Sequence, residues 1–145
     1  MTTSTSTAHW NGDLKSGSGK MTVGDGHYEG PYTFASRFEG SGDGTNPEEL
    51  LAAAHAGCFS MALSNILAGE GHTPESVHTE AVITLGKVDD KPAITHIALS
   101  TVGKVPGIDA ATFEEFAGKA KDGCPVSKLF AGGTADVTLA VSFES

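Results

Sequence analysis

The stretch Asn46-Pro-Glu-Glu-Leu-Leu-Ala-Ala-Ala-His-Ala-Gly-Cys-Phe-Ser-Met61 decides the fold of this chain of 145 residues. Asn46 and the proline after it are typical of the N-cap and the first position of a helix, and Glu49 occupies the capping-box position. Glycine at position 69, followed by a further glycine and a proline, indicates where this helix ends. The sequence therefore predicts one long helix with Cys58 near its middle.

Apolar residues recur along the predicted helix at a spacing that places them on one face. They are Leu51, Ala54, Cys58, Met61 and Ala62. The segment 50–68 raises the question of a membrane span, but its histidine, serines and asparagine make it more polar than the roughly 20 apolar residues that a span needs. We therefore expect a buried core helix and no membrane span, with Cys58 facing inward and His55 on the helix surface or at an interface.

Strand-like and helix-like segments fill the rest of the chain. The expected elements are glycine-punctuated β-hairpins over 10–24, a strand over 32–38, a hairpin of strands 77–88 and 93–102, a helix over 108–122 and a final strand over 137–143. Pro125 suits the first turn of a short third helix, whose N-cap would be Cys124. This order of elements gives the α+β class with an antiparallel sheet.

Charge and length limit the classes of function. The chain carries nine basic and 18 acidic residues, a formal net charge of -9 and no basic cluster, which argues against binding to nucleic acid or to anionic membranes. Residues 1–7 lack the basic and apolar segments of a secretory signal and are expected to form a short disordered tail. We expect residues 1–145 to form a single domain in the cytoplasm, where stable structural disulfides are rare.

Cys58 and Cys124 are the only thiols in the chain. One cysteine on an apolar helix face usually serves packing alone, and two distant cysteines can also form a structural disulfide or a redox pair. A metal site is not expected, because only His55 lies near a cysteine and no second clustered pair completes a ligand set. The chain also has no Gly-x-Ser-x-Gly elbow and no Walker lysine, so serine hydrolase chemistry and phosphate binding are not supported.

Four short motifs in combination resemble the OsmC/Ohr family of thiol-dependent organic hydroperoxide reductases. They are Arg37-Phe-Glu-Gly40, Thr45-Asn-Pro-Glu-Glu-Leu50, Ala54-His-Ala-Gly-Cys-Phe59 and Gly123-Cys-Pro-Val-Ser127. The resemblance covers nearly the whole chain and is closer to the osmotically inducible OsmC branch than to the Ohr branch. It implies an OsmC-like fold, in which an antiparallel sheet packs on a central long helix, and an intertwined homodimer.

The resemblance also implies a role for four residues. Cys58 would be the peroxidatic cysteine, Cys124 the resolving cysteine, Arg37 the partner of the thiolate, and Glu48 the group that orients Arg37. Physical chemistry agrees, because a thiol with an ordinary pKa of about 8.5 in apolar surroundings needs a cation to ionise near neutral pH. A guanidinium with several donors fits better than an ammonium, and burying it calls for an anion. The middle of its own helix gives Cys58 no help from a helix N-terminus.

The implied reaction is that of an antioxidant peroxidase of the oxidative and osmotic stress response. The Cys58 thiolate would reduce organic hydroperoxides, with hydrogen peroxide as a further substrate, and become a sulfenic acid that Cys124 converts to a disulfide. No cofactor is implied, but an external dithiol must reduce the disulfide, and lipoyl groups on proteins serve the family in this role. A non-catalytic module that carries a lipid-like ligand near Cys58 is the alternative. A protein with a purely structural disulfide is a third interpretation.

Helix geometry gives an independent reason to expect a site shared between two chains. Glu48 and Cys58 lie ten positions apart on the predicted helix, which separates them by roughly 15 Å along the axis and by about 80° around it. One chain therefore has difficulty in bringing its own Glu48 beside its own Cys58. We expect Glu48 and Cys58 to serve one site from different chains of a homodimer, with the alanines of 50–62 allowing the helices to approach.

Overall fold

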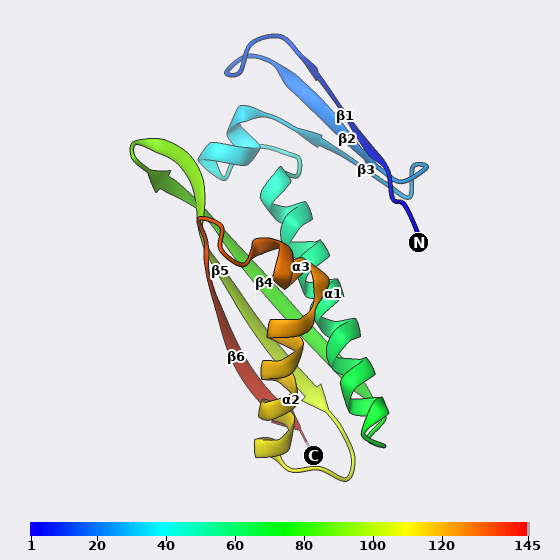
Figure 1. Ribbon diagram of the computed structural model, residues 1–145. Helices are drawn as coiled ribbons and strands as arrows, with labels where there is room; N and C mark the ends of the chain where they lie inside the picture. Colours follow the sequence, from blue (N-terminus) through cyan, green and yellow to red (C-terminus); the bar gives the residue numbers. More distant parts are fainter. Residues whose placement is uncertain (145) are drawn as a thin grey trace. The chain divides into compact units, whose positions relative to one another are not determined.

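Figure 1 shows the computed structural model of the protein, which describes residues 1–144. The chain forms two compact units, one of residues 1–50 and one that begins at Leu51. The first contains one three-stranded sheet, and the second contains another three-stranded sheet with most of the helical structure. The expected single domain over 1–145 stays a prediction.

The sheet of the first unit is an antiparallel meander of β1 (Ser6–Asn11), β2 (Ser18–Val23) and β3 (Tyr28–Tyr32). The predicted glycine-rich hairpins are therefore confirmed. Gly19 lies between two rings, and a Cβ there would come within 2.7 Å of the Trp10 ring and 2.6 Å of the Tyr32 ring.

The N-terminal tail is shorter than the sequence predicts. Ser6 and Thr7 belong to β1, where they pair with Val23 and Thr22 of β2. Backbone pairing with β2 orders these two residues, although their composition is that of a tail. The prediction of disorder over 1–7 is therefore wrong for its last two residues.

The strand predicted over 32–38 is wrong. β3 ends at Tyr32, and the π-helical turn η1 (Ala35–Glu39) follows it. Ser36 folds the chain here, since its hydroxyl donates to the carbonyl oxygen of Thr45 at 2.8 Å and accepts from the backbone N–H of Thr33 at 2.9 Å. Side-chain hydrogen bonds of this kind offer the backbone an alternative to a strand ladder.

Helix α1 (Pro47–Gly69) begins as the sequence predicts. The Asn46 side chain accepts the backbone N–H of Glu49 at 2.8 Å, which confirms Asn46 as the N-cap. The capping box itself is wrong, because the Glu49 carboxylate accepts instead from the Thr45 hydroxyl at 2.7 Å. The Thr45 hydroxyl lies close to the start of the helix and donates to the Glu49 carboxylate, in place of the backbone N–H of Asn46 that a capping box would use.

The predicted apolar face of α1 is correct for Cys58 and Ala62, which pack against the core, but wrong for Met61. Phe59, Leu63 and Leu67 are fully buried, whereas Met61 is 76% exposed. Apolar residues surround the helix, so spacing alone does not tell which side packs on the core. By length and composition α1 is the one helix among residues 1–144 that would pass as a membrane span, a test that the core helix of a soluble protein also passes.

In the second unit, β4 (Ser76–Val88) and β5 (Lys91–Lys104) form the predicted antiparallel hairpin. Its two turn residues, Asp89 and Asp90, have positive φ angles of 50° and 61°. Two successive residues of positive φ are the signature of a tight hairpin turn, in which aspartate is tolerated.

The last strand departs from the predicted antiparallel sheet. β6 (Asp136–Glu144) pairs parallel with β5, because α2 (Ala110–Gly123) and α3 (Pro125–Phe130) form a helical connection between the two strands. Figure 1 shows α1 and α2 on the same face of this sheet. The α+β class is confirmed, and the sheet of the second unit is mixed.

The core of the second unit lies between these helices and the sheet. Its buried members are Phe59, Leu63, Leu67, Leu99, Val105, Phe113, Phe116, Ala117, Ala120 and Cys124. Phe113 packs so closely on β5 that a Cβ added to Gly103 would collide with its ring. The core therefore includes one of the two thiols.

Candidate active site

Cys58 and Cys124 are both free cysteines, and different elements hold them. Cys58 lies in the middle of α1, is half-buried and packs against the core cluster. Cys124 is fully buried and is the N-cap of α3, where Pro125 occupies the first turn. The prediction that Cys124 caps a short third helix is confirmed.

The two thiols are neighbours at the first turn of α3. The Cys124 side chain and the backbone N–H of Val126 both influence the pKa of the Cys58 thiol, which places them beside it. The backbone N–H of Ser127 donates to the Cys124 sulfur at 3.2 Å. The first turn of α3 therefore approaches both sulfur atoms, and its Val126 N–H lowers the pKa of Cys58, a contribution that the position of Cys58 in the middle of α1 did not predict.

Burial decides the ionisation of Cys58. Desolvation raises the pKa of the Cys58 thiol above its ordinary value and outweighs the Val126 N–H, which lowers it. The neighbouring Cys124 raises the same pKa further. Within the second unit Cys58 is thus a protonated thiol at neutral pH, and a reactive thiolate there requires a cation.

The first unit contains an ion pair between Arg37 and Glu48. Arg37 lies in η1 and Glu48 in the first turn of α1. The Arg37 Nη2 atom is 2.8 Å from Glu48 Oε1, and its Nε atom is 3.2 and 3.3 Å from the two carboxylate oxygens. The Glu48 side chain is only 10% exposed, so the carboxylate is held firmly against the guanidinium. Arg37 and Glu48 are therefore paired in one chain.

A cavity of about 240 Å³ opens beside Arg37 in the first unit. Its lining residues are Trp10, Leu14, Tyr32, Thr33, Phe34, Arg37 and Phe38. The guanidinium carbon of Arg37 lies 5.2 Å from the centre of the Phe38 ring, a cation–π contact. Sequence reasoning missed this aromatic cavity, although the recurrence of aromatic residues at 32, 34 and 38 was its visible signal.

His55 is the second residue that sequence reasoning misplaced. It is fully buried, and its Nε2 atom lies 2.8 Å from the hydroxyl of Ser127. The Phe130 ring packs against it edge-on at 5.3 Å. The expected position on the helix surface is wrong, because α3 folds back over this turn of α1 and covers it.

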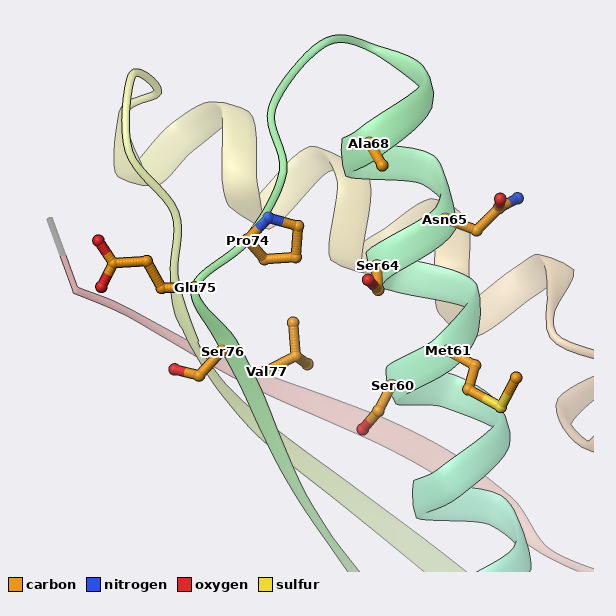
Figure 2. A pocket seen from close by; sticks show the side chains of 9 residues that line it. All are labelled: Ser60, Met61, Ser64, Asn65, Ala68, Pro74, Glu75, Ser76 and Val77. Carbon is orange, nitrogen blue, oxygen red and sulfur yellow. The ribbon is translucent and has the colours of Figure 1, made fainter.

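A larger cavity of about 590 Å³ lies between the C-terminal half of α1 and the start of β4. Figure 2 shows the side chains that line it. Serine hydroxyls, Asn65 and Met61 line it from α1, and Pro74, Glu75 and Val77 line it from the other side. It contains neither thiol and only one charged group. Among residues 1–144, no group of three or more histidine, cysteine, aspartate or glutamate side chains is placed to hold a metal ion.

Two free cysteines lie beside each other at the first turn of α3, and such a dithiol pair has the groups needed to form one disulfide. The chain matches the family of OsmC-like proteins over residues 40–140. It is 51% identical over 139 residues to the peroxiredoxin OsmC of Escherichia coli strain K12, which covers 95% of this chain and 94% of the relative.

Two further comparisons agree. The chain is 34% identical over 102 residues to an organic hydroperoxide resistance protein of Xanthomonas axonopodis pv. citri, which covers 70% of this chain and 69% of the relative. A solved organic hydroperoxide resistance protein of Legionella pneumophila superposes with a TM-score of 0.73 at 26% identity, over 95% of this chain and 96% of that one. The chain belongs to the OsmC family and has its α+β fold with a long central helix.

Proposed function

We propose that this protein is a thiol-dependent peroxidase that reduces organic hydroperoxides to alcohols. The observation that carries the proposal is the contact between two free thiols at the first turn of α3, in a chain half identical to a peroxiredoxin. Two adjacent thiols are what a peroxidase needs in order to turn a cysteine sulfenic acid into a disulfide.

The reaction follows from the position of each sulfur. The Cys58 thiolate attacks the distal oxygen of the hydroperoxide, the O–O bond breaks, and the leaving alkoxide takes a proton from solvent to become the alcohol. Cys58 is then a sulfenic acid, and Cys124 lies beside it, ready to form the disulfide with loss of water. An external dithiol restores both thiols by exchange.

Arg37 completes this site in the proposal. The pKa of Cys58 is raised by burial, so the always-charged guanidinium supplies the attraction that makes a thiolate available at neutral pH. Glu48 holds the guanidinium from one side through two nitrogen atoms, which leaves its remaining N–H groups free to bind the thiolate and the peroxide oxygens. The aromatic cavity beside Arg37 suits the organic group of the substrate.

We infer further that the site is shared between the two chains of a homodimer. Arg37 and Glu48 are paired in one chain, and Glu48 lies ten positions from Cys58 on the same helix. One chain would then supply the Arg37–Glu48 pair and its partner the two thiols. The exposed alanines 53 and 54 and Met61 of α1 provide a surface of small and apolar residues for such an interface.

Mixed dimers test this arrangement. When Glu48→Ala and Cys58→Ser chains are mixed, a shared site predicts that each mixed dimer has one intact site of two, so purified mixed dimers regain about half of the wild-type activity. If the two residues act within one chain, every site lacks one group and mixing restores nothing. A monomer by light scattering would contradict the proposal before any mixing.

The physiological setting belongs to the same proposal. A cytoplasmic protein with a redox-active disulfide needs an intracellular dithiol, and protein-bound lipoyl groups are the proposed reductant. Turnover with reduced lipoamide-bearing protein, but not with monothiols, is the expected result. Equal rates with glutathione would remove lipoyl groups as the preferred reductant.

One assay tests the central proposal. The protein should consume cumene hydroperoxide or tert-butyl hydroperoxide with dithiothreitol as the reductant, in many turnovers for each chain. A protein that binds the peroxide but never consumes it would instead be the lipid-like binding module. A protein isolated under anaerobic reducing conditions without free thiols would be a structural disulfide protein.

A further inference from the structure

The peroxidase proposal leaves one buried ionisable group without a role. His55 is fully buried in the second unit, three residues before Cys58 on α1. A buried imidazole loses its hydrogen bonds to water. Buried polar groups in folded proteins are usually hydrogen-bonded to other protein groups instead.

His55 belongs to a continuous row of hydrogen bonds that ends at a thiol. The Cys124 sulfur donates to the Ser127 hydroxyl at 3.1 Å, and that hydroxyl lies 2.8 Å from Nε2 of His55. Cys124 and Ser127 lie at the start of α3, and His55 reaches them from α1. The row connects the proposed resolving sulfur to an imidazole through one oxygen.

Counting hydrogens fixes the direction of this row. The Ser127 oxygen already accepts the thiol hydrogen of Cys124, so its own hydrogen is free to point at His55 Nε2. In the other tautomer the Ser127 oxygen would accept from both sides and its hydrogen would have no partner. Nε2 is therefore the acceptor and Nδ1 carries the hydrogen, which has no partner among residues 1–144.

Burial keeps His55 neutral before the reaction. Desolvation lowers the pKa of the His55 imidazole below its ordinary value, so its Nε2 atom is unprotonated at neutral pH. Its Nε2 lone pair is therefore free to accept a proton, and the same desolvation favours the return of that proton afterwards.

We propose that His55, acting through Ser127, accepts the proton that Cys124 loses when it attacks the sulfenic acid of Cys58. The inference rests on the peroxidase function proposed above. His55 touches neither sulfur, so it is a positioning residue that acts through the Ser127 hydroxyl.

The step balances in atoms and electrons. The Cys124 proton passes to the Ser127 oxygen as the Ser127 proton passes to His55 Nε2. The sulfur of Cys124 forms the S–S bond and is oxidised, while the S–O bond of the sulfenic acid breaks and the Cys58 sulfur is reduced. The departing hydroxide takes a solvent proton. When the dithiol later displaces Cys124 as a thiolate, the same row returns the proton from His55.

A rival route exists through water. Ser127 also lines a cavity of about 270 Å³, with Lys121 and Lys128 among its other walls. Water in that cavity would be able to take the proton from Ser127 without His55. The test must therefore separate an imidazole that accepts a proton, an imidazole that only positions Ser127, and a water route.

Single-turnover kinetics separate the two chemical steps. The reduced protein is mixed with one equivalent of cumene hydroperoxide, and peroxide loss is followed alongside the appearance of the 58–124 disulfide by acid quench, alkylation and mass spectrometry. His55→Gln keeps an oxygen that accepts the Ser127 hydrogen bond but takes no proton. We expect unchanged peroxide loss and disulfide formation about tenfold to a hundredfold slower in His55→Gln and in Ser127→Ala.

Each other outcome overturns part or all of the proposal. A wild-type rate of disulfide formation in His55→Gln means that His55 only holds Ser127, or that water takes the proton, and the inference fails. If His55→Gln does not fold, an unchanged disulfide rate in Ser127→Ala overturns it equally. Wild-type protein that consumes no peroxide overturns the proposed function and this inference with it.

A matched control uses the other neighbour of the imidazole. Phe130→Leu removes the ring that packs against His55 but leaves the row from Cys124 to Nε2 complete. This variant should form the disulfide at the wild-type rate. A loss equal to that of His55→Gln would show that packing around the imidazole, and not proton transfer, sets the rate, and would overturn the proposal.

Discussion

The two compact units of this protein hold opposite kinds of chemistry. The first unit places a charged pair, Arg37 and Glu48, beside an aromatic cavity. The second unit places two thiols beside a buried core, and the groups that shift the Cys58 pKa there include no cation among residues 1–144. Each unit thus holds what the other lacks. The difference teaches that burial in the second unit works against a reactive thiolate, because desolvation raises the pKa of Cys58, and this is why the proposed mechanism calls on Arg37.

Cys58→Ser is expected to have the largest effect, because it tests whether the Cys58 thiol of the second unit carries out the reaction. Serine is nearly the same size but is not a thiolate nucleophile, so peroxide turnover should fall to background. The variant should keep a wild-type circular dichroism spectrum, since Cys58 is only half-buried. Turnover near the wild-type level in this variant would show that the Cys58 thiol takes no part in the reaction.

Cys124→Ser asks whether the second thiol has a separate task. Without a sulfur to resolve the sulfenic acid, the variant should consume one equivalent of peroxide and then stall or overoxidise. Mass spectrometry after one equivalent should find oxygen adducts on Cys58 in the variant and the 58–124 disulfide in the wild type. Sustained wild-type turnover with a lipoyl-type dithiol would show that Cys124 is dispensable.

Arg37→Ala tests whether the charged pair of the first unit controls the pKa of the Cys58 thiol. Removing a cation near a thiolate should raise the pKa of the Cys58 thiol by about 1 to 3, which means roughly tenfold to a thousandfold less thiolate at neutral pH. The rate of alkylation by iodoacetamide as a function of pH measures this. Arg37→Lys should recover only part of the effect, because an ammonium lacks the second arm that Glu48 binds. An unchanged midpoint in Arg37→Ala would leave the two units chemically independent.

The smallest expected effect concerns stability and His55. The folded-state pKa of His55 is lowered by burial, so the folded protein favours the neutral imidazole. The stability that the folded protein has with a neutral His55 is fully present above the ordinary histidine pKa of about 6.5. It is lost as the pH falls below that value, because the unfolded chain then binds a proton that the folded protein does not. The free energy of unfolding, measured with urea at pH 7.5 and 5.5, should therefore decrease more toward acid pH in the wild type than in His55→Gln. Equal losses would mean that other groups control the acid side.

Local sequence signals predicted the elements that position the thiols. Asn46 caps α1, Cys124 caps α3, and the Asp89–Asp90 turn joins β4 to β5, all as expected. These features depend on hydrogen bonds between residues a few positions apart, so the sequence contains nearly all the information. The motifs around Arg37, Glu48 and the two cysteines were also enough to predict the family.

Tertiary structure decided the rest. Ser36 replaced a predicted strand by η1 because its partner, the Thr45 carbonyl, lies nine residues away. The parallel pairing of β5 with β6 follows from the path of two helices. The sequence by itself determined that this chain has a long helix with a cysteine in its middle and a second cysteine at a helix start. Only the fold decided which side of α1 is buried, and so brought His55 to Ser127 and the two thiols together, because an evenly apolar helix has no preferred face until other elements pack on it.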